Sequence, residues 1–190
     1  MPKIWNETIE AHRAAVTETI FATAARLVEE GGVPALTMSR LAEEAGIGRA
    51  TLYKYFGDVN AVLVGWHQRL MAGHMDALVK ARHGHDNSRT ALEAVLLAYA
   101  EISRRHHGRL LAGVLHGLPH ARHANDHLRS LIERVIGDAV RKGDVRNDAS
   151  PAELSRFVVA ALAAADAAPS KAVTRRVVTM ILQALEPART

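Results

Sequence analysis

One stretch of this 190-residue chain constrains its fold most: LTMSRLAEEAGIGRATLYKYF, from Leu36 to Phe56. It predicts two short helices joined by a tight turn. Thr37 can cap the first helix, because its hydroxyl can accept an amide proton that the opening turn leaves unpaired. Gly46 can end that helix, since glycine accepts the left-handed conformation of a C-terminal cap. With a second helix from Gly48 or Arg49, the pattern is that of a helix-turn-helix, whose second helix enters a DNA major groove.

The second predicted helix has an apolar side and a polar side. Leu52 and Phe56 are four residues apart and face inward. The residues left largely outward are Arg49, Ala50, Thr51, Tyr53, Lys54 and Tyr55. Arginine can bind the acceptors of guanine with two hydrogen bonds, and alanine or a threonine methyl can pack on the thymine methyl. The outward side is therefore a candidate DNA-reading surface.

The composition favours an all-α fold. Hydrophobic residues make up 48% of the chain and aromatic residues only 4%, and no alternating strand pattern stands out. The absence of cysteine excludes disulfides and cysteine-ligated metals. The first ten residues, MPKIWNETIE, lack the apolar run of a signal peptide, and the small-apolar stretch from Phe157 to Ala168 is too short to span a bilayer. We therefore expect a cytoplasmic protein with no membrane contact.

The net charge of +4 does not locate a nucleic-acid site. Residues 1–56 contain 6 Lys or Arg and 7 Asp or Glu, whereas the remaining residues contain 18 and 13. The basic excess therefore lies outside the predicted helix-turn-helix. DNA binding must be argued from individual residues.

Helical periodicity continues along the rest of the chain. A first helix is predicted from Asn6 or Thr8 to Glu30. After the helix-turn-helix, helices are predicted at about 58–82, 89–106, 110–115 and 120–142. Ser150-Pro151-Ala152-Glu153 is a strong start for another helix, because serine can cap it and glutamate can close a capping box. With the final helix after Ser170, the prediction totals about nine helices.

The last two predicted helices have few polar positions. The first carries Leu154, Phe157, Val158, Ala161, Leu162 and Ala165, and the second carries Val173, Val177, Met180, Ile181 and Leu185. A helix without a polar face must be buried on several sides. We therefore expect these helices to pair two subunits in a homodimer, with completion of a monomeric core as the alternative.

Residues 16 to 66 resemble the TetR/AcrR family of bacterial transcriptional regulators. The resemblance rests on three segments: LVEEG at 27–31, LTMSRLAEEAGI at 36–47 and TLYKYF at 51–56. It implies a three-helix N-terminal DNA-binding domain, residues 1–57, and a larger helical domain for effector binding and dimerisation, residues 58–190. It also implies a homodimer formed by the last two helices.

The resemblance assigns roles to particular residues. Arg49, Ala50, Thr51 and Lys54 match positions that face bases, and Thr37, Ser39, Tyr53 and Tyr55 match positions that contact phosphates. Hydroxyl groups near helix starts suit phosphate oxygens, which fix register rather than sequence. Where the family often has a lysine at the start of the fourth helix, this chain has Val59. Fewer cationic contacts imply a shallower salt dependence of DNA binding.

The fourth predicted helix borders the effector cavity in the family. Trp66, Leu70, Met71 and His74 follow one of its faces. Trp66 and His74 are our candidates for effector binding, with ordinary core packing as the alternative. The expected protein is thus a repressor that a small-molecule effector releases from a palindromic double-stranded DNA operator.

Eleven histidines leave a second hypothesis open. His120, His123 and His127 share one helix face, and His116 lies about one turn earlier, so the group could bind zinc, nickel or copper in a metal-responsive regulator. The alternative is a solvated polar face with no metal. Nucleophile elbows, glycine-rich phosphate loops and paired-carboxylate motifs are absent from the sequence. We therefore expect no enzymatic activity and no cofactor.

Overall fold

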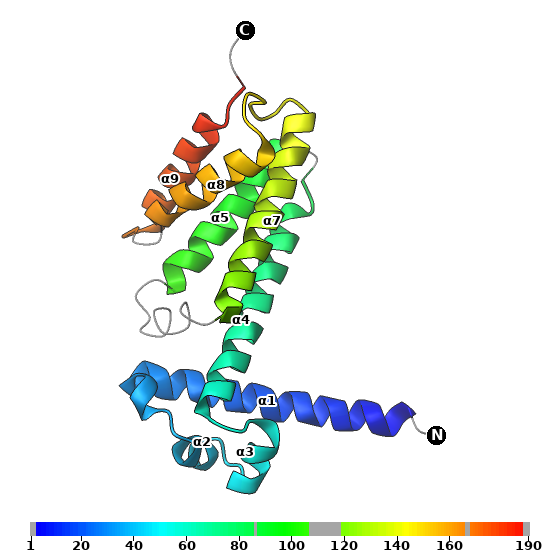
Figure 1. Cartoon of the computed structure of the whole chain (residues 1–190), viewed down its shortest axis with the longest axis vertical. Helices are drawn as coiled ribbons and strands as arrows, with labels where there is room; N and C mark the ends of the chain where they lie inside the picture. The colour runs from blue at the N-terminus through cyan, green and yellow to red at the C-terminus, as the bar shows by residue number, and fades with distance from the viewer. Residues whose placement is uncertain (1–2, 86, 107–118, 166–167, 188–190) are drawn as a thin grey trace. The chain divides into compact units, whose positions relative to one another are not determined.

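The computed structural model describes residues 3–85, 87–106, 119–165 and 168–187. Within these ranges the chain forms α-helices, two short 3-10 helices and loops, with no strand, as the predicted all-α class requires. The predicted helix at 110–115 lies outside the described residues. The described helices are α1 (Lys3–Gly31), η1 (Val33–Ala35), α2 (Met38–Glu44), α3 (Arg49–Tyr55), α4 (Val59–Arg82), α5 (Ser88–His106), α7 (Pro119–Arg141), α8 (Pro151–Leu162), η2 (Ala163–Ala165) and α9 (Lys171–Ala184) (Figure 1).

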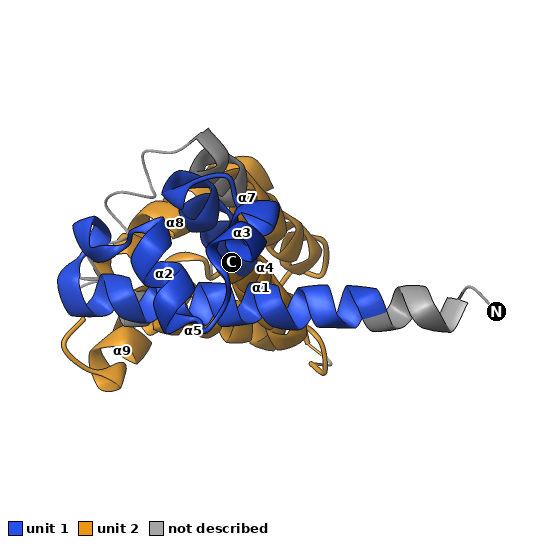
Figure 2. Cartoon of the chain, turned by 90° about the horizontal axis from the view of Figure 1, so that it is seen from below, with its two compact units in different colours: residues 1–69, 109–117 blue, residues 70–108, 118–190 orange. Residues whose placement is uncertain are grey.

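The chain divides into two compact units, coloured separately in Figure 2. Unit 1 comprises residues 1–69 and 109–117, and its described part contains α1, α2, α3 and the first part of α4. Unit 2 comprises residues 70–108 and 118–190, and it contains the rest of α4 with α5, α7, α8 and α9. Helix α4 therefore contributes to both units.

Unit 1 has a small apolar core where its helices meet. Helix α1 packs against η1 and α2, and α2 packs against α3. Ile20, Leu27, Leu41 and Leu52 are fully buried in this core, whereas Phe56, which the sequence pattern also predicts to face inward, is half-buried. The predicted three-helix arrangement therefore rests on a continuous apolar contact.

Gly65 allows α4 to approach two aromatic rings closely. The ring centroids of Phe21 and Phe56 lie 5.4 Å apart, at an interplanar angle of 49°. A β-carbon at position 65 would lie 3.0 Å from Phe21 Cζ and 3.1 Å from Phe56 Cε1. These separations are shorter than an optimal carbon–carbon contact. Because Phe56 directly follows α3, this packing holds the end of α3 against α4.

Unit 2 has a larger core between α5, α7, α8 and α9. Its fully buried side chains include Leu92, Leu96, Ile132, Ile136 and Leu162. Helix α8 begins as predicted, since the Ser150 hydroxyl accepts the N–H of Glu153 at 3.3 Å and the Glu153 carboxylate accepts the N–H of Ser150 at 2.9 Å. The hydrogen bonds from Ser150 lower the pKa of the Glu153 carboxyl.

Helices α8 and α9 are not buried all round within one chain. Leu154, Val158 and Leu162 pack into the core of unit 2, but Phe157 remains 46% exposed and Met180 remains 58% exposed. The two exposed side chains line a shallow apolar groove of about 230 Å³ between α8 and α9. The apolar surface of these helices therefore exceeds what the single chain covers.

Candidate DNA-binding surface

The turn between α2 and α3 is fixed by caps at both ends of α2. Thr37 Oγ1 accepts the backbone N–H of Arg40 at 3.2 Å, so the predicted cap is confirmed. Gly46 has a φ of +66°, in the left-handed region that glycine adopts without steric cost. Gly46 and Ile47 donate backbone N–H groups to carbonyls of the last turn of α2, at 3.2 and 3.0 Å. This paired bonding is a Schellman motif, and it redirects the chain into α3.

Helix α3 presents most of the predicted DNA-reading residues to solvent. Leu52 is fully buried, while Tyr53 is 54% exposed. Exposed side chains also include Arg49, Ala50, Thr51 and Lys54. The two cationic residues of α3 therefore lie on its accessible side together with a phenol, an arrangement that suits an acidic, hydrogen-bonding partner.

Tyr55 differs from its neighbours on α3. The sequence pattern places it largely outward, but its side chain is half-buried. The guanidinium carbon of Arg13, on α1, lies 5.7 Å from the centroid of the Tyr55 ring. A cation over an aromatic face is attracted by the electron density of the ring. This contact places a positive charge from α1 beside the end of α3.

The start of α2 offers two hydroxyl groups. Thr37 and Ser39 are both exposed. The Thr37 oxygen accepts a hydrogen bond from the backbone, yet its hydroxyl proton can still be donated. Both residues therefore have the chemistry that the predicted phosphate contacts need.

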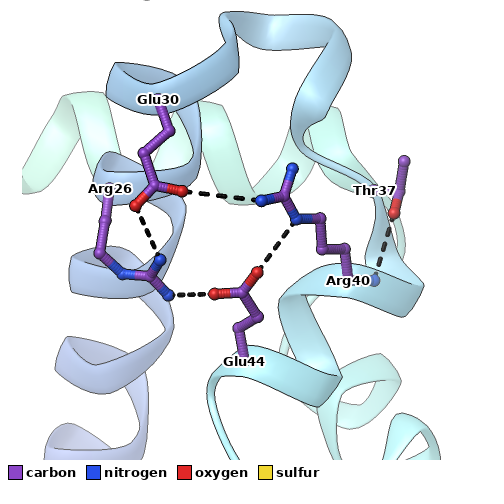
Figure 3. A network of polar contacts seen from close by, with 5 residues as sticks. All are labelled: Arg26, Glu30, Thr37, Arg40 and Glu44. Atoms are coloured by element: carbon purple, nitrogen blue, oxygen red, sulfur yellow. Dashed lines mark hydrogen bonds and ion pairs between the residues drawn. The ribbon is translucent and has the colours of Figure 1, made fainter.

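A closed ring of ion pairs joins α1 to α2 (Figure 3). Arg26 contacts Glu30 at 3.0 Å and also pairs with Glu44. Arg40 contacts Glu44 at 3.0 Å and Glu30 at 3.6 Å. Two cations and two carboxylates alternate around this Arg26–Glu44 ring, which is neutral as a whole.

The Arg26–Glu44 ring alters the ionisation of its members. Hydrogen bonds from Arg26, and then from Arg40, hold the pKa of the Glu44 carboxyl below its ordinary value. Hydrogen bonds to Glu44 and Glu30 raise the pKa of Arg26. Each side chain is partly exposed, so solvent screens these pairs. The ring fixes the orientation of α2 more than it adds stability.

Sequence reasoning missed the Arg26–Glu44 ring and the Arg13–Tyr55 contact. The i, i+4 spacing of Arg26 and Glu30, and of Arg40 and Glu44, could have indicated two of the four ion pairs. Nothing in the local sequence signals the pairs between α1 and α2, because these depend on how the two helices pack.

The proposed effector residues lie on α4. Trp66 and His74 are both half-buried, as either a cavity lining or an ordinary packed residue would be. Trp66 belongs to unit 1 and His74 to unit 2. Their role in effector binding remains a prediction.

The histidine group is only partly described. His116 lies outside the described residues, as do the side chains of His120 and His123. His127 is described and exposed. Among the described residues no group of three or more potential metal ligands comes together. The metal-responsive hypothesis gains no support.

Comparison with known proteins decides the family of the helix-turn-helix. A family profile described as bacterial regulatory proteins, tetR family, matches residues 20–63. This segment belongs to the TetR family. The match runs from α1 through the capped turn and α3 into the first part of α4. A search of curated protein sequences finds no match.

Solved structures share the fold of the chain over most of its length. A TetR/AcrR-family transcriptional regulator from Thermobifida fusca gives a TM-score of 0.76 at 16% identity, over 92% of this chain and 98% of that one. Ketosteroid transcriptional regulator KstR2 of Mycobacterium tuberculosis gives 0.64 at 18% identity, over 90% and 94%. FadR from Bacillus subtilis, solved in complex with stearoyl-CoA, gives 0.69 at 12% identity, over 89% and 99%. At these identities the likeness establishes the fold alone.

None of the described helices combines the length and the apolar character needed to cross a bilayer.

Proposed function

We propose that this protein is a transcriptional repressor that binds a palindromic DNA operator as a homodimer and is released by a small-molecule effector. The observation that carries the proposal is the exposed face of α3. This helix follows α2, which is capped at both ends, and both helices lie within the segment that matches the TetR family. A helix presented in this way fits the major groove. Residues 1–57 would then form the DNA-binding domain and residues 58–190 the effector-binding and dimerisation domain.

The proposed division of labour follows the chemistry of the exposed side chains. Arg49, Ala50, Thr51 and Lys54 would face base edges, where arginine distinguishes guanine and methyl groups recognise thymine. Thr37, Ser39, Tyr53 and Tyr55 would donate hydrogen bonds to phosphates and fix the register. The position of Arg13 over the Tyr55 ring adds a cation beside one of these phosphate contacts.

The apolar groove of α8 and α9 supports a dimer. Phe157 and Met180 expose apolar surface next to the half-buried or buried residues Ala161, Val177 and Ile181. A second copy of the same two helices would cover this surface, and a two-fold dimer is self-complementary. Two copies of α3 about 34 Å apart would then read the two halves of a palindrome.

The effector would bind beside α4. Trp66 offers an aromatic wall and His74 a polar group on the same helix, a combination typical of small-molecule sites. Among proteins of the same fold, KstR2 is a ketosteroid regulator and FadR was solved with stearoyl-CoA. We infer an apolar effector for this chain. Because effector and DNA would bias one equilibrium, each would weaken the binding of the other by the same factor. A repressor of this kind would act in the cytoplasm, where the chromosome lies.

The experiment begins with selection of a binding sequence from random DNA. Arg49→Ala should then weaken binding by about 1–3 kcal/mol at the selected site, because one bidentate base contact is lost. Tyr53→Phe should weaken binding to all sequences alike, since it removes a phosphate contact. Arg129→Ala, at an exposed position of α7 in unit 2, is the matched control. Unchanged affinity in both α3 variants, with dimers that remain folded, would refute the proposed reading surface.

A further inference from the structure

A polar hollow in unit 2 has none of the predicted DNA-reading or effector residues in its lining. Its volume is about 520 Å³, and it is formed by the end of α4, the second half of α7 and the start of α8. Three arginines line it: Arg82, Arg134 and Arg141. Pockets of this size hold small molecules in many proteins. The chemistry of its walls indicates which kind of molecule would fit.

One carboxylate in the hollow forms ion pairs with two arginines. Asp138 forms ion pairs with both Arg82 and Arg141. The Asp138 side chain is only 31% exposed, and that of Arg82 is 35% exposed. The Arg141 side chain is 71% exposed, so two guanidinium groups around a single carboxylate leave a net positive charge that a molecule in the hollow can reach. The partly buried Arg82–Asp138 pair is screened less than a pair on an open surface.

A third arginine extends the positive wall along α7. Arg134, Asp138 and Arg141 are spaced i, i+4 and i+7, so they share one face of the helix. Arg134 is exposed and makes no ion pair with any residue that the structure describes. Its guanidinium is therefore available to a molecule in the hollow. Glu133, also in the lining, offsets one of the three arginines.

Gly137 lies in the lining of the hollow, between Arg141 and Pro151. The Nη1 atom of Arg141 lies 3.5 Å from the place where a β-carbon on Gly137 would be, and two carbons of Pro151 lie 3.9 Å from that place. These are ordinary van der Waals separations, and they place the Arg141 guanidinium close to α7 at position 137.

A second, smaller hollow continues the positive strip. Its volume is about 170 Å³, and it shares Arg82 and Asp138 with the first. It adds the cation of Lys142 and the imidazole of His85. Together the two hollows are lined by four Lys or Arg side chains and by two carboxylates, those of Glu133 and Asp138. The excess of cations favours an anionic ligand.

We propose that these adjoining hollows bind a phosphorylated small molecule, with its phosphate held by Arg134 and Arg141 beside the Arg82–Asp138 pair. Guanidinium groups match the geometry of phosphate oxygens and bind them with pairs of charge-assisted hydrogen bonds. A phosphate monoester carries close to two negative charges at neutral pH. It therefore neutralises the excess positive charge of the hollows better than a single carboxylate does. The hollow leaves space for the rest of the molecule. All residues that line the two hollows belong to unit 2, and none is a predicted DNA-reading residue.

Isothermal titration calorimetry on the full-length protein tests the proposal, with inorganic phosphate, adenosine 5′-monophosphate and acetate as probes. We expect both phosphates to bind one site per chain, and acetate to bind much more weakly. Arg134→Gln and Arg141→Gln should each weaken phosphate binding about tenfold or more, because each removes charge-assisted hydrogen bonds. Arg129→Gln, on the same helix and outside the hollow, should leave binding unchanged. Tighter binding of the nucleotide than of free phosphate is expected, because the hollow exceeds the size of the anion.

A substitution of the carboxylate gives a test in the opposite direction. Asp138→Asn removes a negative charge from the hollow, so it should strengthen phosphate binding even if it lowers the melting temperature. If the arginines served only to pair with Asp138, this variant would lose stability and gain no affinity for phosphate. That result would overturn the proposal. So would the absence of saturable binding at millimolar phosphate, or equal binding of acetate and phosphate.

Discussion

Substitution of Gly65 by alanine tests whether the close approach of α4 to two phenylalanine rings positions α3. A new β-carbon would meet Phe21 Cζ at 3.0 Å and Phe56 Cε1 at 3.1 Å. Each ring blocks the retreat of the other, since their centroids are only 5.4 Å apart. Overpacking of this kind costs about 1–3 kcal/mol. Alanine is a better helix former than glycine by about 1 kcal/mol, which offsets part of that cost.

The same helix supplies a matched control. Gly73 also lies within α4, and a β-carbon there would meet nothing within 4 Å. Gly73→Ala should therefore stabilise the protein by about 1 kcal/mol through helix propensity alone. The difference between the two variants isolates the steric cost at position 65, which we expect to be about 1–3 kcal/mol.

Urea unfolding followed by circular dichroism measures both free energies, and titration of the selected operator measures the effect on α3. Gly65→Ala should weaken operator binding as well as stability, because a displaced Phe56 moves the end of α3. Gly73→Ala should preserve operator affinity. If Gly65→Ala stabilises the protein as much as Gly73→Ala does, then the rings of Phe21 and Phe56 can move aside without cost. The close packing at Gly65 would then not position α3.

Three further predictions concern the other contacts. The lowered pKa of Glu44 means that its ion pairs stabilise the native state fully above its ordinary value of 4.5 and are lost as pH falls through the lower folded value. Glu44→Gln should therefore lower the urea midpoint at neutral pH, and its midpoint should converge with that of the wild type in acid. Ser150→Ala should lower the free energy of unfolding by about 1 kcal/mol through loss of the α8 cap, measured by urea unfolding. Phe157→Ser should raise the dimer dissociation constant at least about tenfold in sedimentation equilibrium, since each copy loses a buried aromatic ring.

The parts of the fold that could be predicted from sequence are those with local causes. Thr37 and Ser150 accept the amide protons that their positions indicate. Gly46 adopts the left-handed backbone expected at the end of α2. Each of these features depends on a few neighbouring residues, so the sequence contains the whole reason for it. The resulting capped turn is enough to predict most of the side chains of α3 that face outward, with Tyr55 as the exception.

The parts that could not be predicted depend on packing between distant residues. Arg26 meets Glu44 only because α1 and α2 lie side by side. Arg13 reaches the Tyr55 ring from a different helix, and Tyr55 is half-buried rather than outward. Periodicity likewise identifies Phe157 as apolar but cannot say whether its own chain or another covers it. The identity of the effector is harder still to predict from sequence, because it depends on the detailed shape of the binding site.

The charge of the DNA-binding segment leads to a last prediction about salt. Residues 1–56 contain six Lys or Arg, but Arg26 and Arg40 are engaged with carboxylates in the Arg26–Glu44 ring. Arg13, Arg49 and Lys54 are exposed and remain for phosphates or bases, while the side chain of the sixth, Lys3, lies outside the described residues.

If these three act in each subunit of a dimer, the logarithm of the operator association constant should fall with the logarithm of salt concentration with a slope of about −5. Fluorescence anisotropy at several salt concentrations measures this slope. Arg13→Met should make it shallower by about 2, one phosphate per subunit, whereas Arg13→Lys should preserve it. A wild-type slope of about −9 would mean that about two more cations per subunit contact phosphates, and Arg26→Met and Arg40→Met would show whether these are the two arginines of the Arg26–Glu44 ring. If they are, the ion pairs of the Arg26–Glu44 ring would have to break when DNA binds. The ring would then hold two arginines that are released to contact phosphates, rather than orient α2.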